Sequence, residues 1–296
     1  MSFNEIKRLV NIPSNGYIQE RHFRRAFKEA KKLLSDGTAH TNNFLQIIYD
    51  ILERDSQEEG SDKQIVDVMN KIDDSMDKYS NLFDKNIGNI LTNIKVGHAN
   101  VLDLSQSDES VANVLVSHIM RNSLQKRKNA IHGKDTDTLD FPVFFILEEA
   151  HILAPNKRDS DSKRWIQRVA REGRKFGLGL CLVSQSPKTV DHDALSQMNN
   201  MIILRLVEPE DQRHVQSASE SLSQDLINQL PSLNVGEAIV LGLMSRVPTL
   251  VKIDEFNGRR HGDDMDIISY FADIKKKESE EIEKLEQESL EMGYNY

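Results

Sequence analysis

The stretch Phe141-Pro-Val-Phe-Phe-Ile-Leu-Glu-Glu-Ala-His151 places a short apolar run directly before two adjacent carboxylates, Glu148 and Glu149. A buried strand that ends in two acids is costly unless the acids face solvent or a cation, because a buried charge loses its hydration. In parallel α/β sheets, ligands bind at the carboxyl ends of the strands. The stretch therefore predicts a strand whose acids lie at a ligand-binding edge.

The rest of the chain after about residue 98 shows further short apolar runs, and these are residues 100–104, 178–183, 201–206, 238–243 and 249–253. Several are continuous, as expected of strands that are covered on both faces. Helical patterns lie between most of them, most clearly at 109–125, where Ser107 is a candidate N-cap. This alternation predicts an α/β fold with a mostly parallel, doubly wound sheet flanked by helices. The last two runs are close enough to form an antiparallel edge pair.

The chain before residue 90 has a different texture, with apolar residues at helical spacing, for example Phe44, Ile47, Ile48 and Ile51. We expect a helical subdomain at 1–90, an α/β core at 91–256 and a charged helical arm at 257–296. The stripes of the subdomain are interpreted as packing faces without chemistry. Residues 273–296 carry a net charge of −4, which fits a solvated helix or an arm that docks on a neighbouring subunit.

Composition places this chain of 296 residues, with a net charge of −9, among soluble globular proteins. The single cysteine, Cys181, cannot form an internal disulfide, which favours a reducing, cytoplasmic compartment. No apolar run approaches 18 residues and the N-terminus lacks a signal-peptide pattern, so we expect no membrane partner.

The paired acids suit nucleotide hydrolysis. Glu148 would hold Mg²⁺ indirectly, through a water molecule, and Glu149 would orient the attacking water as a base. Gln185 ends the next apolar run, where its amide could sense the γ-phosphate or position water. The alternatives are structural, because acids also favour the first turn of a helix and Ser184-Gln185-Ser186-Pro187 could be a simple cap or turn.

A basic segment follows the acids, since residues 156–177 carry eight basic against three acidic side chains. Arg164, Arg168, Arg171 and Lys175 have spacings that place them on one helix face. Three interpretations remain open, namely a solvated amphipathic helix, a charge given to a nucleotide across a subunit boundary, and contact with DNA phosphates.

A phosphate-binding loop of the form Gly-x-x-x-x-Gly-Lys-Ser/Thr is missing from the 296 residues. The one Gly-Lys pair, Gly133-Lys134, is followed by Asp135 and has no upstream glycine at the required spacing. His-Glu-x-x-His, Cys-x-x-Cys and Gly-x-Ser-x-Gly are also absent. His151 follows the acids and fits a packing role as well as a catalytic one.

Four stretches in this order resemble the HerA/FtsK superfamily of DNA-translocating ATPases, and in particular its HerA type. They are 101–105, the acid-bearing stretch 141–151, which resembles the Walker B strand, 170–179 and 182–187. The resemblance covers roughly residues 90–256, whereas residues 1–85 are similar only in being helical.

The resemblance implies a RecA-like core, with ATP and Mg²⁺ as cofactors and double-stranded DNA as substrate. It also implies a homo-oligomer, a hexameric ring when complete, and a partner nuclease of the NurA type, or another effector, in DNA end resection. Arg171 and Arg174 would then serve the nucleotide, while Arg164, Arg168 and Lys175 are candidates for DNA or interface contacts.

In such motors the phosphate-binding loop precedes the helical subdomain, so we expect it N-terminal to Met1. The chain would then be a C-terminal fragment, a truncated gene product or half of a split motor. A catalytically inactive ring subunit or scaffold of a DNA-processing or defence complex is the main rival. A DEAH-type helicase shares the Glu-Ala-His string, but it requires a second motor domain for which 296 residues leave no room.

Overall fold

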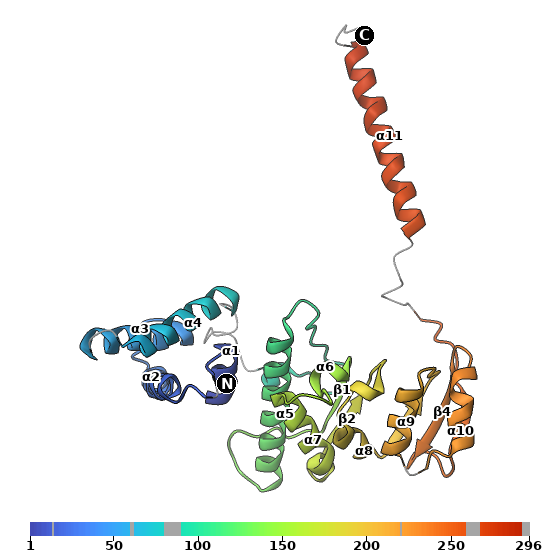
Figure 1. The fold of residues 1–296 in the computed structure, drawn as a ribbon, viewed down its shortest axis with the longest axis horizontal. Helices are drawn as coiled ribbons and strands as arrows, with labels where there is room; N and C mark the ends of the chain where they lie inside the picture. The colour runs from blue at the N-terminus through green and yellow to red at the C-terminus, as the bar shows by residue number, and fades with distance from the viewer. Residues whose placement is uncertain (14, 60–61, 80–89, 220, 259–266, 292–296) are drawn as a thin grey trace. The chain divides into compact units, whose positions relative to one another are not determined.

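The computed structural model describes residues 1–13, 15–59, 62–79, 90–219, 221–258 and 267–291 (Figure 1). The chain divides into two compact units, Met1–Lys252 and Ile253–Tyr296. In the second unit, α11 (Ile267–Glu291) is the predicted C-terminal helix. Residues 259–266, near the start of the predicted arm, lie outside the described residues.

The N-terminal part of the first unit is helical, as its apolar periodicity predicts. Its elements are α1 (Phe3–Leu9), α2 (Tyr17–Ser35), α3 (Phe44–Glu59) and α4 (Lys63–Tyr79). The predicted stripes form its core, in which the ring of Phe27 makes edge contacts with Phe3 and Phe44, each at 5.4 Å between centroids. Val111 and Val114 also belong to this core. The bundle is thus packed against the helix that follows it.

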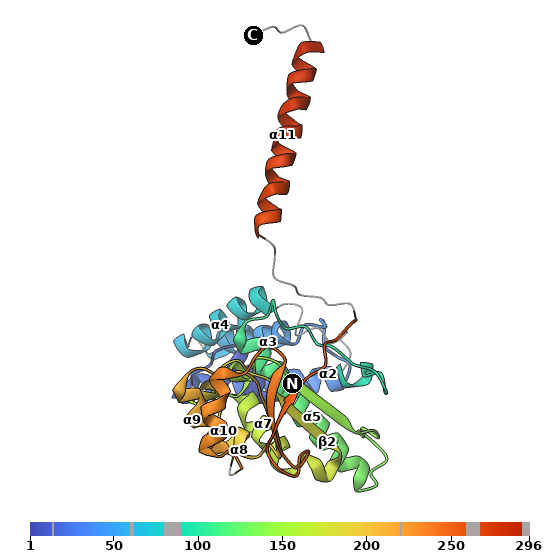
Figure 2. The same ribbon diagram turned by 90° about the vertical axis from the view of Figure 1, so that its right-hand side faces the viewer.

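The strand that carries the acids, β1 (Val143–Leu147), has the predicted bounds and pairs in parallel with β2 (Leu178–Leu182). The helices α5 (Glu109–Ile131) and α7 (Asp161–Glu172) lie side by side and pack with the sheet in one apolar cluster (Figures 1 and 2). The N-cap position of α5 is Asp108, one residue later than the predicted Ser107. The α/β class and the parallel pairing beside the acids are confirmed.

The opposite face of β1 is uncovered in the described residues. Phe144 is 65% exposed and Ile146 is 62% exposed, so the strand alternates between a packed and an open face. The ring of Phe144 lies so close to Gly179 of β2 that a Cβ there would be 2.3 Å from a ring carbon. The expectation that the strands are covered on both faces is therefore wrong for β1.

A second sheet contains β3 (Asn200–Ile203), β4 (Glu237–Gly242) and β5 (Thr249–Lys252) in antiparallel order. The predicted antiparallel pair of the last two strands is confirmed. The β3–β4 pair is also antiparallel, in contrast to the mostly parallel sheet that was expected. The connection brings the chain back beside the end of β3, where the Leu206 N–H donates to the Leu230 carbonyl. β4 therefore runs back along β3 in the opposite direction.

The connection between β3 and β4 contains α9 (Pro209–Ala218) and α10 (Gln224–Gln229). The described residues of the first unit also contain shorter helical segments, which are η2 (Ile90–Asn93), α6 (Ala150–Leu153), η3 (Gly173–Phe176), η4 (Pro187–Thr189), α8 (His192–Ser196) and η5 (Leu230–Ser232). None of the helices described has both the length and the apolar character needed to span a bilayer.

The predicted strand at 100–104 is wrong. The Asn100 side chain closes a loop, because its Oδ1 accepts from the Lys95 N–H at 2.9 Å and its Nδ2 donates to the Lys95 carbonyl at 3.0 Å. Val101 is 89% exposed. An apolar run becomes a strand only when another strand pairs with it, and none of the described strands pairs with this run.

Candidate functional site

The two acids lie where the parallel strands end. The Val183 N–H donates to the Leu147 carbonyl at 2.9 Å, and the Ala150 N–H donates to the Val183 carbonyl at the same distance. These two bonds fix the end of β1 to the end of β2, and between them the chain turns out through Glu148 and Glu149. The acids therefore follow the carboxyl end of β1, as the sequence predicts.

Glu149 has a left-handed backbone, with φ 48° and ψ 48°, at the N-cap of α6. A residue with a Cβ pays roughly 1–2 kcal/mol in this region, because the Cβ approaches the following carbonyl oxygen. Strained conformations of this kind gather at functional sites, where the surrounding structure enforces them. The sequence gives no sign of this geometry, since the usual left-handed residues are Gly and Asn.

The Glu149 carboxylate is held by two side chains and stays open to solvent. Gln185 Nε2 donates to its Oε1 at 3.4 Å, and His151 Nδ1 lies 3.2 Å from its Oε2. The side chain keeps 46% of its exposure. Ser184 Oγ lies 3.5 Å from the same His151 nitrogen. An oriented, half-exposed carboxylate with a neighbouring amide can position a water molecule and accept its proton.

Glu149 and Gln185, two of the predicted site residues, are therefore brought together. His151 and Ser184 are the additional members of this group. His151 is placed beside the carboxylate by the short helix α6, which begins directly after Glu149. Nothing in the sequence pattern singles out Ser184, because its contact depends on the register between β1 and β2.

Glu148 is exposed, and within the described structure no hydrogen bond or ion pair joins its side chain to this group. It follows Phe144 and Ile146 in the alternation of the strand, on the uncovered side. Cys181 of β2 pairs with Ile146 and interacts electrostatically with Glu148. Burial raises the pKa of the Cys181 thiol, and the nearby Glu148 carboxylate raises it further. The two acids thus have different surroundings, as two different roles would require.

A metal site made by protein side chains alone is not found, since the described residues contain no cluster of three or more His, Cys, Asp or Glu suited to an ion. Mg²⁺ commonly binds through one or two carboxylates, with water and substrate phosphates as its other ligands. An exposed carboxylate such as Glu148 fits that mode of binding.

The basic segment is divided between two elements. Arg164, Arg168 and Arg171 lie on α7, which ends at Glu172, whereas Arg174 and Lys175 lie in η3. The expected single helix face that includes Lys175 is therefore wrong. The reason lies at Gly173, where a Cβ would be only 3.0 Å from the Leu178 carbonyl, so the chain tightens there to enter β2.

Arg168 is engaged within the chain, because its Nε donates to Glu172 at 2.5 Å and its guanidinium lies over the Trp165 ring at 5.1 Å. Burial alone would raise the pKa of Glu172, but hydrogen bonds from Lys128 and Arg168 outweigh it and lower the pKa. Arg164 and Arg171 are exposed. The α7 part of the basic segment thus contains one arginine held by contacts within the chain, Arg168, and two exposed arginines, Arg164 and Arg171.

Arg171 and Arg174 are not brought to the acids of their own chain. The η3 segment leads into the start of β2, and the Gly177 carbonyl accepts from the Val143 N–H at the start of β1. The acids follow the other end of β1, a strand of five residues that spans roughly 16 Å at about 3.3 Å per residue. These arginines therefore lie toward the opposite edge of the sheet from Glu149.

Comparison with known proteins gives two adjacent family matches. Residues 1–123 match the family described as Helicase HerA, central domain, and residues 133–257 match Helicase HerA-like C-terminal. The resemblance thus reaches back to residue 1. The view that residues 1–85 are similar only in being helical was too narrow, because a surface-exposed bundle offers few motifs that can be recognised without an alignment.

Curated relatives carry the same name. The protein called DNA double-strand break repair helicase HerA from Sulfurisphaera tokodaii is 40% identical over 289 residues, which are 95% of this chain and 57% of that protein. Its namesake from Saccharolobus solfataricus is 39% identical over 292 residues, with 96% and 58% covered. The chain therefore spans less than three fifths of the length of these relatives.

Among solved structures, VirB4 of Thermoanaerobacter pseudethanolicus matches with a TM-score of 0.55 at 12% identity, over 86% of this chain and 67% of that one. This likeness concerns the fold alone. The two family matches and the relatives near 40% identity concern the sequence itself, along almost its whole length. The chain belongs to the HerA helicase family.

Proposed function

We propose that this chain is the part of an ATP-driven, double-stranded DNA motor that holds the hydrolytic carboxylates. The observation that carries the proposal is the Glu149 carboxylate, kept in a left-handed turn at the ends of two parallel strands and contacted by Gln185, which follows the neighbouring strand β2. That edge is where ligands bind in α/β sheets, and the relatives are named as DNA repair helicases.

In this proposal Glu149 orients the attacking water and accepts its proton, while the Gln185 amide holds the carboxylate and reports on the γ-phosphate. His151 fixes the second carboxylate oxygen. Glu148 would hold Mg²⁺ through a water molecule, and the metal would neutralise charge on the phosphates of ATP. The separation of the two acids allows one to face the metal while the other faces the water.

The phosphate-binding loop is the part that these 296 residues do not supply, since they contain no Gly-x-x-x-x-Gly-Lys-Ser/Thr. We infer that another polypeptide segment provides it. In the described structure β2 pairs only with β1, and β3 pairs only with β4, so each has a free edge. The open apolar face at Phe144 and Ile146 offers further surface for such a segment to cover.

Arg171 and Arg174 are proposed to act on the nucleotide of a neighbouring subunit. Their position toward the opposite edge of the sheet from Glu149 supports action between chains rather than within one. A closed homo-oligomer, in our proposal a hexameric ring, would bring such an edge to the next subunit's acids. Arg164, Arg168 and Lys175 remain candidates for DNA or interface contacts, and a NurA-type nuclease in end resection remains a proposed partner.

A second candidate function is a catalytically inactive ring subunit or scaffold, and the missing phosphate-binding loop favours it. The strained Glu149 opposes it, because a chain without catalysis has no reason to keep a glutamate in a region that costs roughly 1–2 kcal/mol. We therefore retain the motor as the proposed function.

The test uses a protein in which this chain is joined to the phosphate-binding segment of a longer HerA relative. We expect it to displace a third strand from a DNA triplex in the presence of ATP and Mg²⁺, and we expect the Glu149→Gln variant to bind the same DNA without displacing the strand. Strand displacement that continues without nucleotide, or at an unchanged rate in Glu149→Gln, would contradict the proposal.

A further inference from the structure

The helix α2 concentrates positive charge in a bundle that is otherwise acidic. Tyr17–Ser35 contains six Lys and Arg against two Glu, a net charge of +4. The rest of residues 1–79 contains six basic against twelve acidic side chains. A random scatter of charges would not place half of the basic residues of this part on one helix, so the distribution points to a partner.

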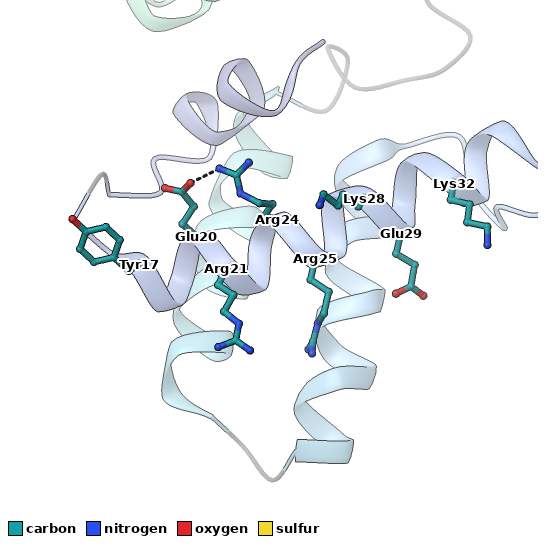
Figure 3. A pocket seen from close by; sticks show the side chains of 8 residues that line it. All are labelled: Tyr17, Glu20, Arg21, Arg24, Arg25, Lys28, Glu29 and Lys32. Atoms are coloured by element: carbon teal, nitrogen blue, oxygen red, sulfur yellow. Dashed lines mark hydrogen bonds and ion pairs between the residues drawn. The ribbon is translucent and has the colours of Figure 1, made fainter.

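The charges on α2 are also gathered on one side. Arg21, Arg25, Lys28 and Lys32 fall within roughly 60° of arc on a helix with about 3.6 residues per turn, and we call these four residues the α2 basic face. All four are exposed. Figure 3 shows Arg21, Arg25 and Lys32 pointing to the same side of the helix. Tyr17, which is 81% exposed, lies at the start of the same face.

The two acids of α2 are already neutralised by other side chains. Glu29 accepts two hydrogen bonds from Arg54 of α3, at 2.9 and 3.1 Å. Glu20 is bound by Lys7 and by Arg24, and these hydrogen bonds hold its pKa below the ordinary value. The carboxylates beside the α2 basic face therefore do not cancel its charge.

The cations of the face itself are mostly available. Arg25 is held in place by Asp55 at 2.8 Å and keeps 47% of its side-chain exposure. Within the described part of the chain, no hydrogen bond or ion pair joins Arg21, Lys28 or Lys32 to another side chain. Three uncompensated cations on one helix face form a site for a polyanion.

We propose that the α2 basic face binds the phosphate backbone of duplex DNA. The four cations extend from residue 21 to residue 32, or roughly 16 Å at a rise of about 1.5 Å per residue. Duplex DNA of that length carries about ten phosphates, at one charge per roughly 1.7 Å. Lysines are depleted at protein interfaces, and the centres of such interfaces carry few charged residues. A phosphate backbone therefore fits the face better than an acidic protein does.

This inference rests on the proposed function only in taking duplex DNA as the ligand. It adds a contact far from the hydrolytic residues in sequence, on a separate helical element. Such a contact would be independent of base sequence and would weaken with salt, because each bound phosphate releases counterions.

The test measures binding of the whole 296-residue chain to a fluorescein-labelled 40-base-pair duplex by anisotropy across a series of salt concentrations. We expect the Arg21→Gln/Lys28→Gln/Lys32→Gln variant to lower the slope of log K against log salt by about 2 to 3 units, at about 0.9 per phosphate contact. A Lys28→Arg/Lys32→Arg variant, which retains the charge, should keep the slope of the unmodified chain.

The matched control, Lys63→Gln/Lys134→Gln/Arg246→Gln, removes three exposed charges elsewhere and should leave the slope unchanged. An equal slope for the α2 variant and the unmodified chain would overturn the proposal and favour an acidic protein partner. The proposal would also be overturned if the control lowered the salt slope as much as the α2 variant, or if the unmodified chain did not bind the duplex at low salt. If the triple variant does not fold by circular dichroism, Lys28→Gln alone should lower the slope by about 1 unit.

Failure of this inference can be told from failure of the proposed function. In the protein completed with a phosphate-binding segment, the α2 variant should hydrolyse ATP at an unchanged rate without DNA. If DNA binding is unaffected by the α2 changes while Glu149→Gln stops hydrolysis, the DNA contact lies elsewhere and the motor assignment stands. If hydrolysis survives Glu149→Gln, the assignment of the acids fails whatever the α2 variant does.

Discussion

Glu149 shows how a single residue can connect fold and chemistry. Its left-handed backbone turns the chain out of β1 and places its carboxylate beside Gln185 and His151. The sequence predicts the acids and Gln185 at one sheet edge, because both follow apolar runs. It does not predict the contact between His151 and Ser184, because this contact depends on the register of β1 and β2.

The strain at Glu149 gives a prediction on stability that needs no partner. We expect Glu149→Gly to stabilise the isolated chain by about 1 kcal/mol, because glycine adopts the left-handed region without a Cβ clash. Urea unfolding followed by circular dichroism measures this. In the control, Glu148→Gly, the backbone is not left-handed, and glycine should lower stability by about 0.5–1 kcal/mol. Lower stability for both variants would show that Glu149 is not strained.

At the scale of elements, the strands that could be predicted are those with a clear feature beside them in the sequence. β1 ends where the acids begin, and the antiparallel β4–β5 pair follows from its short connection. The run at 100–104 is also partly apolar yet forms no strand in the described structure, because pairing is a property of two segments and a sequence window contains one. The end of α7 at Glu172 was missed for a similar reason, since the close contact of Gly173 with Leu178 is tertiary.

Two helices are joined by a buried carboxylate that predicts a pH response. Asp191 caps α8 through the Ala194 N–H at 2.9 Å, and it also accepts from Gln167 at 2.7 Å and pairs with Lys163 at 3.0 Å on α7. Burial alone would raise the pKa of Asp191, but these hydrogen bonds and the charge of Lys163 lower it below the ordinary value. The link therefore requires the ionised form.

Because the folded pKa of Asp191 is depressed, its contribution is complete above the unfolded value of about 3.9 and is lost as the pH falls through the folded value. We expect Asp191→Asn to cost about 3 kcal/mol at neutral pH, as loss of a buried charge partner typically does. The difference from the unmodified chain should shrink below about pH 4. Asp193→Asn, an exposed change on the same helix, is the control. A constant difference from pH 7 to pH 3 would contradict this role.

At the scale of the whole molecule, the fold class and the family were accessible from four motifs, whereas the extent of the family match was not. The open face of β1 and the division into two sheets were also not predictable, because periodicity reports what a strand can bury and not what covers it. Both features bear on how the chain works, since each leaves surface for another segment.

The missing phosphate-binding loop leads to a direct expectation for the chain alone. It should hydrolyse no ATP above background, because its sequence lacks the Gly-x-x-x-x-Gly-Lys-Ser/Thr loop whose backbone amides hold the phosphates. A coupled assay of ADP release measures this, with a chain carrying Glu149→Gln as the blank. Magnesium-dependent turnover by the unmodified chain that disappears in Glu149→Gln would refute the expectation.

The proposed action of Arg171 and Arg174 between subunits is tested in rings of the completed protein. An arginine at the γ-phosphate contributes roughly 10³ to 10⁵ in rate, so Arg174→Ala and Glu149→Gln subunits should each be inactive alone. Mixed rings should recover part of the activity, because some interfaces combine an intact Glu149 with an intact arginine. The same mixture is made with Arg171→Ala.

No recovery in either mixture, in rings shown to have exchanged subunits, would place the arginines within their own chain or on DNA. The salt slope of DNA binding separates those two cases. Loss of a phosphate contact lowers the slope by about one unit, whereas loss of a nucleotide contact leaves it unchanged.

The central claim, that Glu149 activates the water in nucleotide hydrolysis, is tested most directly by the single-turnover rate of ATP hydrolysis in the completed protein. We predict that Glu149→Gln lowers this rate by about 10²-fold or more while ATP affinity stays within a few-fold, because the carboxylate acts after binding. The control Glu53→Gln, an exposed change in the bundle, should hydrolyse ATP at the unmodified rate. A Glu149→Gln protein that retains a rate near that of the unmodified protein would contradict the claim.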